Sequence, residues 1–277
     1  MRLYTLLSIL YVALEMTVIA EIPYKDGVLT VADSRLTFSL NLPFMSDRMM
    51  HSDGHRKIFE SKDGDMVVAA GGDVILSDKV VDYFLSHQAI LEWYCKNADD
   101  ETNIYIRKQL DGMLEELPEH MAALLVSVRL DDGRIKSFRV EVENEFGSPF
   151  TTFEEITSAA AYGSPETLDE YLEKLVEKHG NEGRERSLAE AMALGFLLED
   201  RYIDEYRVVE KTGQRIKDVG GPIAMHATSK EPSKDVDLRI GNLERKRMEE
   251  KTYKELVAYF TDKIGETGVK KQKSKSF

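Results

Sequence analysis

The sequence predicts a layered α+β fold, in which groups of strands alternate with pairs of helices. Three features of the 277-residue chain support this prediction. A tight Lys25-Asp26-Gly27 turn joins two alternating apolar segments, which is the pattern of a β-hairpin. A second turn, Asp131-Asp132-Gly133, joins another such pair. Amphipathic helical segments follow each group of strands, so we expect sheets that are covered by helical layers.

The expected elements follow one another closely along the chain. They are a hairpin at 17–33, strands at 57–59 and 66–70, helices at about 77–95 and 102–117, a hairpin at 122–129 and 135–143, a strand at 155–162, helices after Ser164 and Ser187, a strand at 216–227, and a charged amphipathic helix at about 238–265. Residues 36–55, which are rich in methionine, are expected to form a loop. The hydroxyls of Ser77, Ser164 and Ser187 suit helix N-caps.

The composition excludes some classes of partner. Lys and Arg number 37 against 50 Asp and Glu, and the resulting net charge of −13 repels nucleic acid. The lysines of the last eight residues are expected to form a solvated end. The chain has one cysteine, Cys95, in an apolar helical segment; it cannot form an internal disulfide and is expected to be a buried thiol. This cysteine usage favours a reducing compartment, so we expect a cytoplasmic protein without a membrane partner.

Residues 1–16 imitate a signal peptide, because one Arg is followed by an apolar run. The run is shorter than the roughly 20 residues that a membrane span needs. Signal peptidase prefers small residues where this segment has Leu14 and Met16. Two alternatives stay open: a pro-segment that is removed during maturation, or an upstream extension with synthesis starting at Met16.

The residues around the first hairpin point to chemistry. Thr17 begins the hairpin and Asp33 ends it, and the ends of a hairpin are neighbours in space. If Met16 is lost, Thr17 carries a free α-amine and becomes a nucleophile with its own base. An α-amine titrates near 7.7–8.0 in a peptide, so it needs a nearby positive charge to be a good base at neutral pH.

This pattern resembles the proteasome β-type N-terminal-nucleophile hydrolases, including the bacterial relative that works with an unfolding ATPase. Thr17, the hairpin and Ala32-Asp33-Ser34-Arg35 carry the resemblance, and Lys57, followed by two strands and the pair Gly71-Gly72, continues it. It covers about 17–228, so we expect a proteasome-like domain there, a leader at 1–16, and a C-terminal helical extension with a basic tail at 229–277. The resemblance implies a four-layer αββα sandwich with an added C-terminal helix.

The resemblance also implies an activity and roles for particular residues. The expected activity is that of a threonine endopeptidase without a cofactor, working on peptide or protein substrates in a homo-oligomeric ring, with an ATP-dependent unfoldase as a further partner. Thr17 would be the nucleophile, Lys57 would lower the pKa of its amine, and Asp33 would hold Lys57. Backbone N–H groups of Gly71 or Gly72 would bind the oxyanion, and Ser164 would position the amine.

The sequence departs from the family in the last predicted strand. The family places an Asp and a Ser just before a Gly-Gly pair, whereas Lys217-Asp218-Val219 precedes Gly220 here. The Ser is therefore missing. The acid that supports the amine stays open between three candidates, Asp200, Asp204 and Asp218.

Two alternative functions remain at the sequence level. If an amine rather than water resolved the ester on Thr17, the same site would belong to a protein ligase. A non-catalytic proteasome-like subunit is the other alternative, favoured by Val219 and by the long segment 36–55. The six histidines show no metal-ligand spacing such as HExxH, so no metal site is expected.

Overall fold

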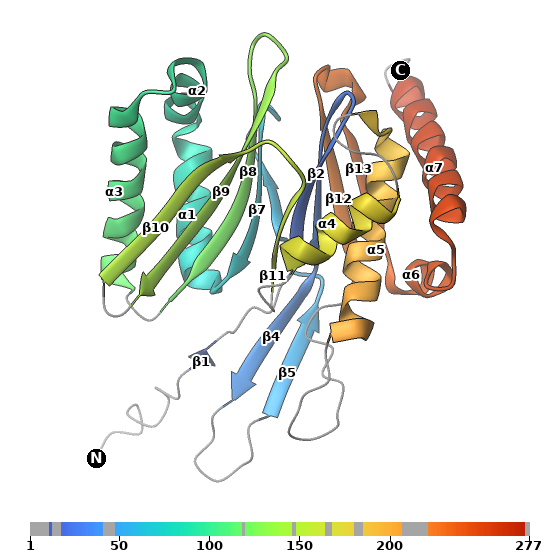
Figure 1. Cartoon of the computed structure of the whole chain (residues 1–277), viewed down its shortest axis with the longest axis horizontal. Coiled ribbons are helices and arrows are strands. Elements are labelled where there is room, and N and C mark those ends of the chain that lie inside the picture. The colour runs from blue at the N-terminus through green and yellow to red at the C-terminus, as the bar shows by residue number, and fades with distance from the viewer. Residues whose placement is uncertain are drawn as a thin grey trace.

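Two five-stranded antiparallel sheets lie face to face, with helices on their outer sides (Figure 1). The computed structural model describes residues 11–12, 18–40, 48–117, 120–145, 148–163, 168–179, 185–206 and 221–274. This arrangement of helices, sheet, sheet and helices confirms the four-layer sandwich expected from the resemblance.

Sheet I, as we name it, has the strand order β11-β2-β3-β12-β13. Its strands are β2 Val18–Tyr24, β3 Gly27–Asp33, β11 Ala160–Gly163, β12 Ile223–Ser229 and β13 Val236–Ile240. The helices α4 Leu168–Lys178, α5 Leu188–Tyr206 and α7 Tyr253–Ser274 cover its outer face, and α6 Asn242–Met248 connects β13 to α7. At the start of α5, Ser187 and Glu190 form a reciprocal capping box, as the N-cap prediction required.

Sheet II has the strand order β10-β9-β8-β7-β6. Its strands are β6 Ile58–Glu60, β7 Met66–Gly72, β8 Ala122–Arg129, β9 Ile135–Glu145 and β10 Ser148–Ile156. The helices α1 Val74–Ser86, α2 Gln88–Asn97 and α3 Asp100–Glu116 cover its outer face. Cys95 of α2 is buried, and burial raises the pKa of its thiol to about 12, so it is the inert structural thiol that was expected.

Close backbone packing requires glycine at two strand ends. A Cβ atom on Gly27 would lie 2.0 Å from the carbonyl oxygen of Thr228, so only glycine lets β3 pair with β12 at the hairpin turn. Gly72 has a φ of +100°, and a Cβ atom there would lie 2.6 Å from the carbonyl oxygen of Met121. Its backbone therefore needs glycine whether or not it takes part in catalysis.

The layer between the sheets is apolar in one part and polar in another. Ile19 and Ala32 of sheet I pack there against Ile58, Val67 and Leu125 of sheet II. Next to this cluster, four polar residues occupy paired positions on successive strands of sheet I: Glu21, Thr30, His226 and Asp237. Directly opposed residues of antiparallel strands point to the same face, so these side chains form one polar row across the sheet.

The structure corrects several sequence predictions. Residues 36–55 do not form a plain loop, because β4 Arg35–Leu40 and β5 Arg48–Asp53 pair as a hairpin; with β1 Tyr11–Val12 they make a small third sheet that projects from the sandwich in Figure 1. The single helix expected at 77–95 is two helices, and Asp73 rather than Ser77 is the N-cap of the first.

The C-terminal part of the chain also differs from the prediction. The segment expected to be one helix at 238–265 begins inside the edge strand β13 and continues as α6 and α7. Met248, Leu256 and Phe260 of this segment are fully buried in the same apolar cluster as α5. This part of the chain therefore packs as a layer of the sandwich.

Candidate active site

A buried ion pair at the end of β3 joins two of the predicted site residues. The Lys57 ammonium lies 2.8 Å from Oδ1 of Asp33, and the two side chains are 1% and 0% exposed. Asp33 ends β3 and Lys57 immediately precedes β6, so the pair connects sheet I to sheet II. Burial removes water from both charged groups, and direct contact between the carboxylate and the ammonium offsets this loss of hydration.

The same carboxylate is close to the strand that follows Thr17. The backbone N–H of Val18 donates to Oδ1 of Asp33 over 3.3 Å. Val18 is the first residue of β2 and is bonded directly to Thr17 in the chain. Asp33 thus contacts both the Lys57 ammonium and the backbone of the residue after Thr17.

The other strand beside β2 leads to Ser164. β11 pairs with β2, and the last pair in the register joins Gly163 to Val18. Thr17 and Ser164, the residues next to this pair in the sequence, lie outside the described residues. Their assignments as nucleophile and as positioning hydroxyl therefore stay predictions.

The expected oxyanion donors end a central strand. Gly71 and Gly72 are the last residues of β7 and pair with Ala123 and Ala122 of β8. The hydroxyl of Ser77 donates to the carbonyl oxygen of Gly71 over 2.9 Å, which fixes the orientation of the peptide that follows. In this way the first turn of α1 holds the end of β7.

Of the three candidate acids, Asp200 is the one whose side chain the structure describes. Its Oδ1 accepts from Nε of Arg245 over 3.1 Å, and this guanidinium also donates to the carbonyl oxygens of Gly221 and Glu199. Asp200 thus takes part in fastening α6 to α5. The side chain of Asp204 and all of Asp218 lie outside the described residues.

Glu199, which was not predicted from the sequence, is completely buried in α5. Burial, followed by the negative charge of Asp33, raises the pKa of the Glu199 carboxyl well above its usual range, while the charges of Arg245 and Lys57 oppose this shift. Neither of its carboxyl oxygens has a hydrogen-bond partner within the described part of the chain. Its position on a buried face of α5 was the available signal, because a Glu among apolar residues needs an explanation.

A pocket of about 390 Å³ opens beside the ion pair. Ser34 and Lys57 contribute to its wall, and its far side is made by β12 and β13. Three titratable side chains, Glu60, His226 and Asp237, line the same pocket. The pocket thus lies next to the end of β3 and the Asp33–Lys57 ion pair.

Comparison with known proteins identifies the fold. No protein-family model matches the chain, and no curated protein matches it in sequence. Among solved structures, the chain is similar to a Gly-1 mutant of Anbu from Hyphomicrobium sp. strain MC1, at a TM-score of 0.51 and 12% identity. The match covers 90% of this chain and 95% of that chain. The two chains therefore share a fold, with two antiparallel five-stranded sheets between helical layers, and this is the αββα sandwich that the sequence resemblance implied.

Within this αββα sandwich, the described elements around the candidate site are β2, β3, β6, β7 and β11. At 12% identity, the similarity shows the arrangement of the chain. None of the helices in the described ranges is long and apolar enough to cross a membrane.

Proposed function

We propose that this chain is a threonine peptidase that uses Thr17 as an N-terminal nucleophile. The observation that supports it is the buried Asp33–Lys57 ion pair, whose carboxylate also accepts from the N–H of the residue after Thr17. Burying two charged side chains is costly because both lose their hydration. An ion pair with no function beyond stability could form on the surface without this cost.

The proposed reaction proceeds through an ester. The Thr17 hydroxyl attacks the carbonyl carbon of the scissile peptide bond, while its own α-amine accepts the hydroxyl proton and then passes it to the leaving amine. The product carbonyl remains attached to Thr17 as an ester. Water then adds to this ester, and its hydrolysis releases the carboxylic acid and regenerates the hydroxyl. Backbone N–H groups at Gly71 or Gly72 would bind the oxyanion in both steps.

Lys57 would keep the amine in its neutral form. A positive charge near an α-amine lowers the pKa of that amine, because protonation would bring two positive charges together. Asp33 would hold the Lys57 ammonium in place. The charges of Asp33 and Lys57 also act on the buried Glu199 carboxyl, where Asp33 raises its pKa and Lys57 opposes the rise.

The finer parts of the proposal follow from the family resemblance. They are a cytoplasmic homo-oligomeric ring, peptide or protein substrates, and an ATP-dependent unfoldase that delivers them. An acceptor amine in place of water would make the same site a protein ligase. Product analysis with and without an added amine nucleophile distinguishes these outcomes.

The test compares turnover of a fluorogenic peptide amide across variants. Lys57→Ala should lower the rate by about 10²–10⁴-fold if it removes effective general-base help. Lys57→Arg keeps the positive charge but replaces the compact ammonium with a planar guanidinium, and we expect it to lower the rate nearly as much. Thr17→Ser keeps both hydroxyl and amine and should retain partial turnover, whereas Thr17→Ala should retain none.

Thermal melts separate catalysis from folding. Because the ion pair is buried, Lys57→Ala should also lower the free energy of unfolding, by about 3–5 kcal/mol, since the Asp33 carboxylate loses its counter-ion. Rates are therefore compared at a temperature where every variant is folded. Lys57→Ala turning over as fast as the parent, while Thr17→Ala is inactive, would contradict the role of Lys57.

A further inference from the structure

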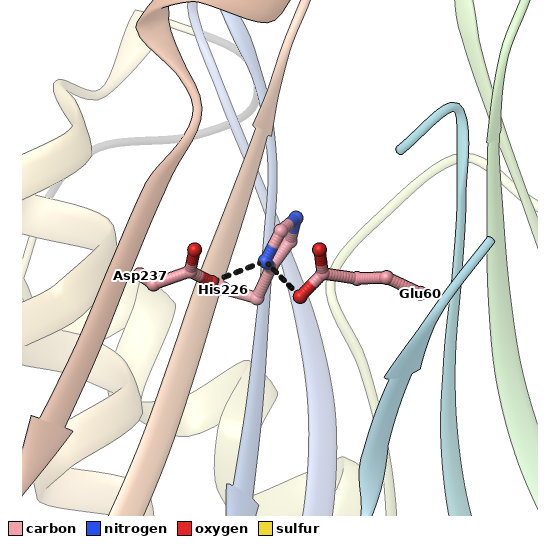
Figure 2. A group of neighbouring side chains, drawn as sticks. All are labelled: Glu60, His226 and Asp237. Atoms are coloured by element: carbon pink, nitrogen blue, oxygen red, sulfur yellow. Dashed lines mark hydrogen bonds and ion pairs between the residues drawn. The ribbon is translucent and has the colours of Figure 1, made fainter. Parts of the chain in front are cut away.

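Glu60, His226 and Asp237 form a side-chain cluster that the proposed peptidase chemistry does not use. Figure 2 shows the imidazole of His226 between the two carboxylates. Nδ1 of His226 lies 2.6 Å from Oδ1 of Asp237 and 3.3 Å from Oε1 of Glu60. All three ligand-type atoms lie within 4.8 Å of one another. We propose that this cluster binds a Zn²⁺ ion.

The fold brings the three residues together from both sheets. His226 of β12 and Asp237 of β13 are directly opposed in the antiparallel register, so their side chains point to the same face of sheet I. Glu60 ends β6, the edge strand of sheet II, and reaches the cluster from the other side. A metal ion here would link the two sheets at the wall of the 390 Å³ pocket.

The distances need little adjustment to suit zinc. Two atoms bound to one tetrahedral Zn²⁺ at about 2.1 Å lie about 3.4 Å from each other. The separation of 3.3 Å between His226 and Glu60 already matches this value, whereas the 2.6 Å between His226 and Asp237 must widen. The Asp237 side chain is 69% exposed, so it can move by this amount without disturbing the core. Water would complete the coordination on the open side of the pocket.

The other nitrogen of His226 provides an independent argument. When a metal binds Nδ1, the ring proton lies on Nε2, and ligating histidines donate this proton to a second group. Nε2 of His226 and the hydroxyl of Thr30 are both buried, and neither has a hydrogen-bond partner within the described residues. Thr30 lies directly opposite His226 on β3 and points to the same face. Thr30 is therefore well placed to accept the Nε2 proton.

The ligand types favour zinc over other common divalent ions. An imidazole nitrogen suits Zn²⁺ better than Mg²⁺ or Ca²⁺, which prefer oxygen ligands alone. Zn²⁺ also binds a mixed nitrogen and oxygen site more tightly than Mn²⁺ does. Two carboxylates would offset the charge of the ion, so the site would be neutral when occupied. This inference is independent of whether Thr17 is a nucleophile.

Calorimetric titration of the chelator-treated full chain with zinc chloride tests the inference. We expect one zinc ion to bind per chain and to raise Tm. His226→Gln should abolish the binding, and Asp237→Asn and Glu60→Gln should each weaken it by about tenfold or more. Asp237→Asn changes a largely exposed side chain, so a failure to fold is not expected to obscure the result. Thr30→Val should weaken binding while leaving the stoichiometry unchanged.

A matched control comes from another His–Asp pair. Nδ1 of His120 lies 2.8 Å from Oδ1 of Asp73, and no third ligand-type residue joins them in the described ranges. His120→Gln should therefore leave zinc binding unchanged, and so should His55→Gln in the same pocket. The proposal is overturned if the parent shows no zinc-dependent heat or Tm shift, or if His226→Gln binds zinc like the parent. Tighter binding of Mn²⁺ than of Zn²⁺ would overturn the assignment to zinc.

Discussion

At the scale of single residues, Glu21 connects the stability of the sandwich to pH. It is fully buried between the sheets, where the Ser127 hydroxyl donates to its Oε1 over 2.8 Å. Burial raises the pKa of Glu21 from 4.5 to about 7, although hydrogen bonds from Ser137 and Ser127 oppose this shift. Between these two pH values the folded chain keeps a proton that the unfolded chain has lost, so the free energy of unfolding falls as pH rises.

Glu21→Gln should remove this pH dependence. The difference between the two pKa values corresponds to about 3 kcal/mol of stability, lost progressively as the pH rises from about 4.5 to about 7. Urea unfolding at about pH 5 and about pH 8 measures it in the parent and the variant. The exposed Glu173→Gln serves as the control. Equal pH dependence in the parent and in Glu21→Gln would show that Glu21 ionises normally.

Some residues of the candidate site were predicted from the sequence, and others were not. Asp33 and Lys57 were predicted to pair from the family pattern, and they do. Glu199 was not predicted, because its burial depends on which face of α5 packs against sheet I. The cluster of Glu60, His226 and Asp237 was also missed, since its members come from three strands in two sheets and no short spacing marks them.

At the scale of elements, local turn chemistry explains which predictions succeeded. The hairpins at Lys25-Asp26-Gly27 and at Asp131-Asp132-Gly133 were predicted because their turn residues are diagnostic. The pairing of β4 with β5 was not predicted, because 36–55 has no clear alternation of apolar and polar residues. β13 was missed since its Val-Asp-Leu-Arg-Ile sequence runs into a charged helical stretch.

The helix α7 is predicted to contribute strongly to stability. Phe260 is completely buried in the cluster that α5 and sheet I share, and α7 lies along α5 in Figure 1. Phe260→Ala should lower the free energy of unfolding by about 3–5 kcal/mol through lost burial and a residual cavity. Chemical denaturation measures this loss. Leu243→Ala in α6, at a site 76% exposed, should change stability by less than about 0.5 kcal/mol. An equally small loss for Phe260→Ala would mean that α7 does not belong to the core.

At the scale of the whole molecule, we predict that the chain forms homo-oligomers. The outer helical layer of sheet II exposes Trp93, Ile104 and Tyr105, at 59%, 52% and 44%. Trp93 and Tyr105 border an open groove of about 870 Å³ between α2 and α3. Exposed aromatic side chains of this kind are typical of surfaces that contact another protein. A second copy of this chain is the occupant that the family resemblance favours.

Sedimentation velocity tests this prediction. The parent should sediment as an oligomer at micromolar concentration, and Trp93→Glu should shift it toward the monomer if this helical layer makes the contact. Glu101→Lys, on the same groove, changes charge without removing an aromatic group and serves as the control. A parent that sediments only as a monomer at every concentration would contradict the prediction.

The most direct measurement of the central claim is a mass map of the N-terminus after reaction with an electrophilic acyl probe. The protein is expressed from Met16, treated with a peptide β-lactone, and analysed as intact chain and as peptides. The account predicts a chain that begins at Thr17 and carries one probe on that residue, with no labelling in Thr17→Ala. A chain that retains Met16, or a probe that labels Thr17→Ala as well as it labels the parent, would contradict it.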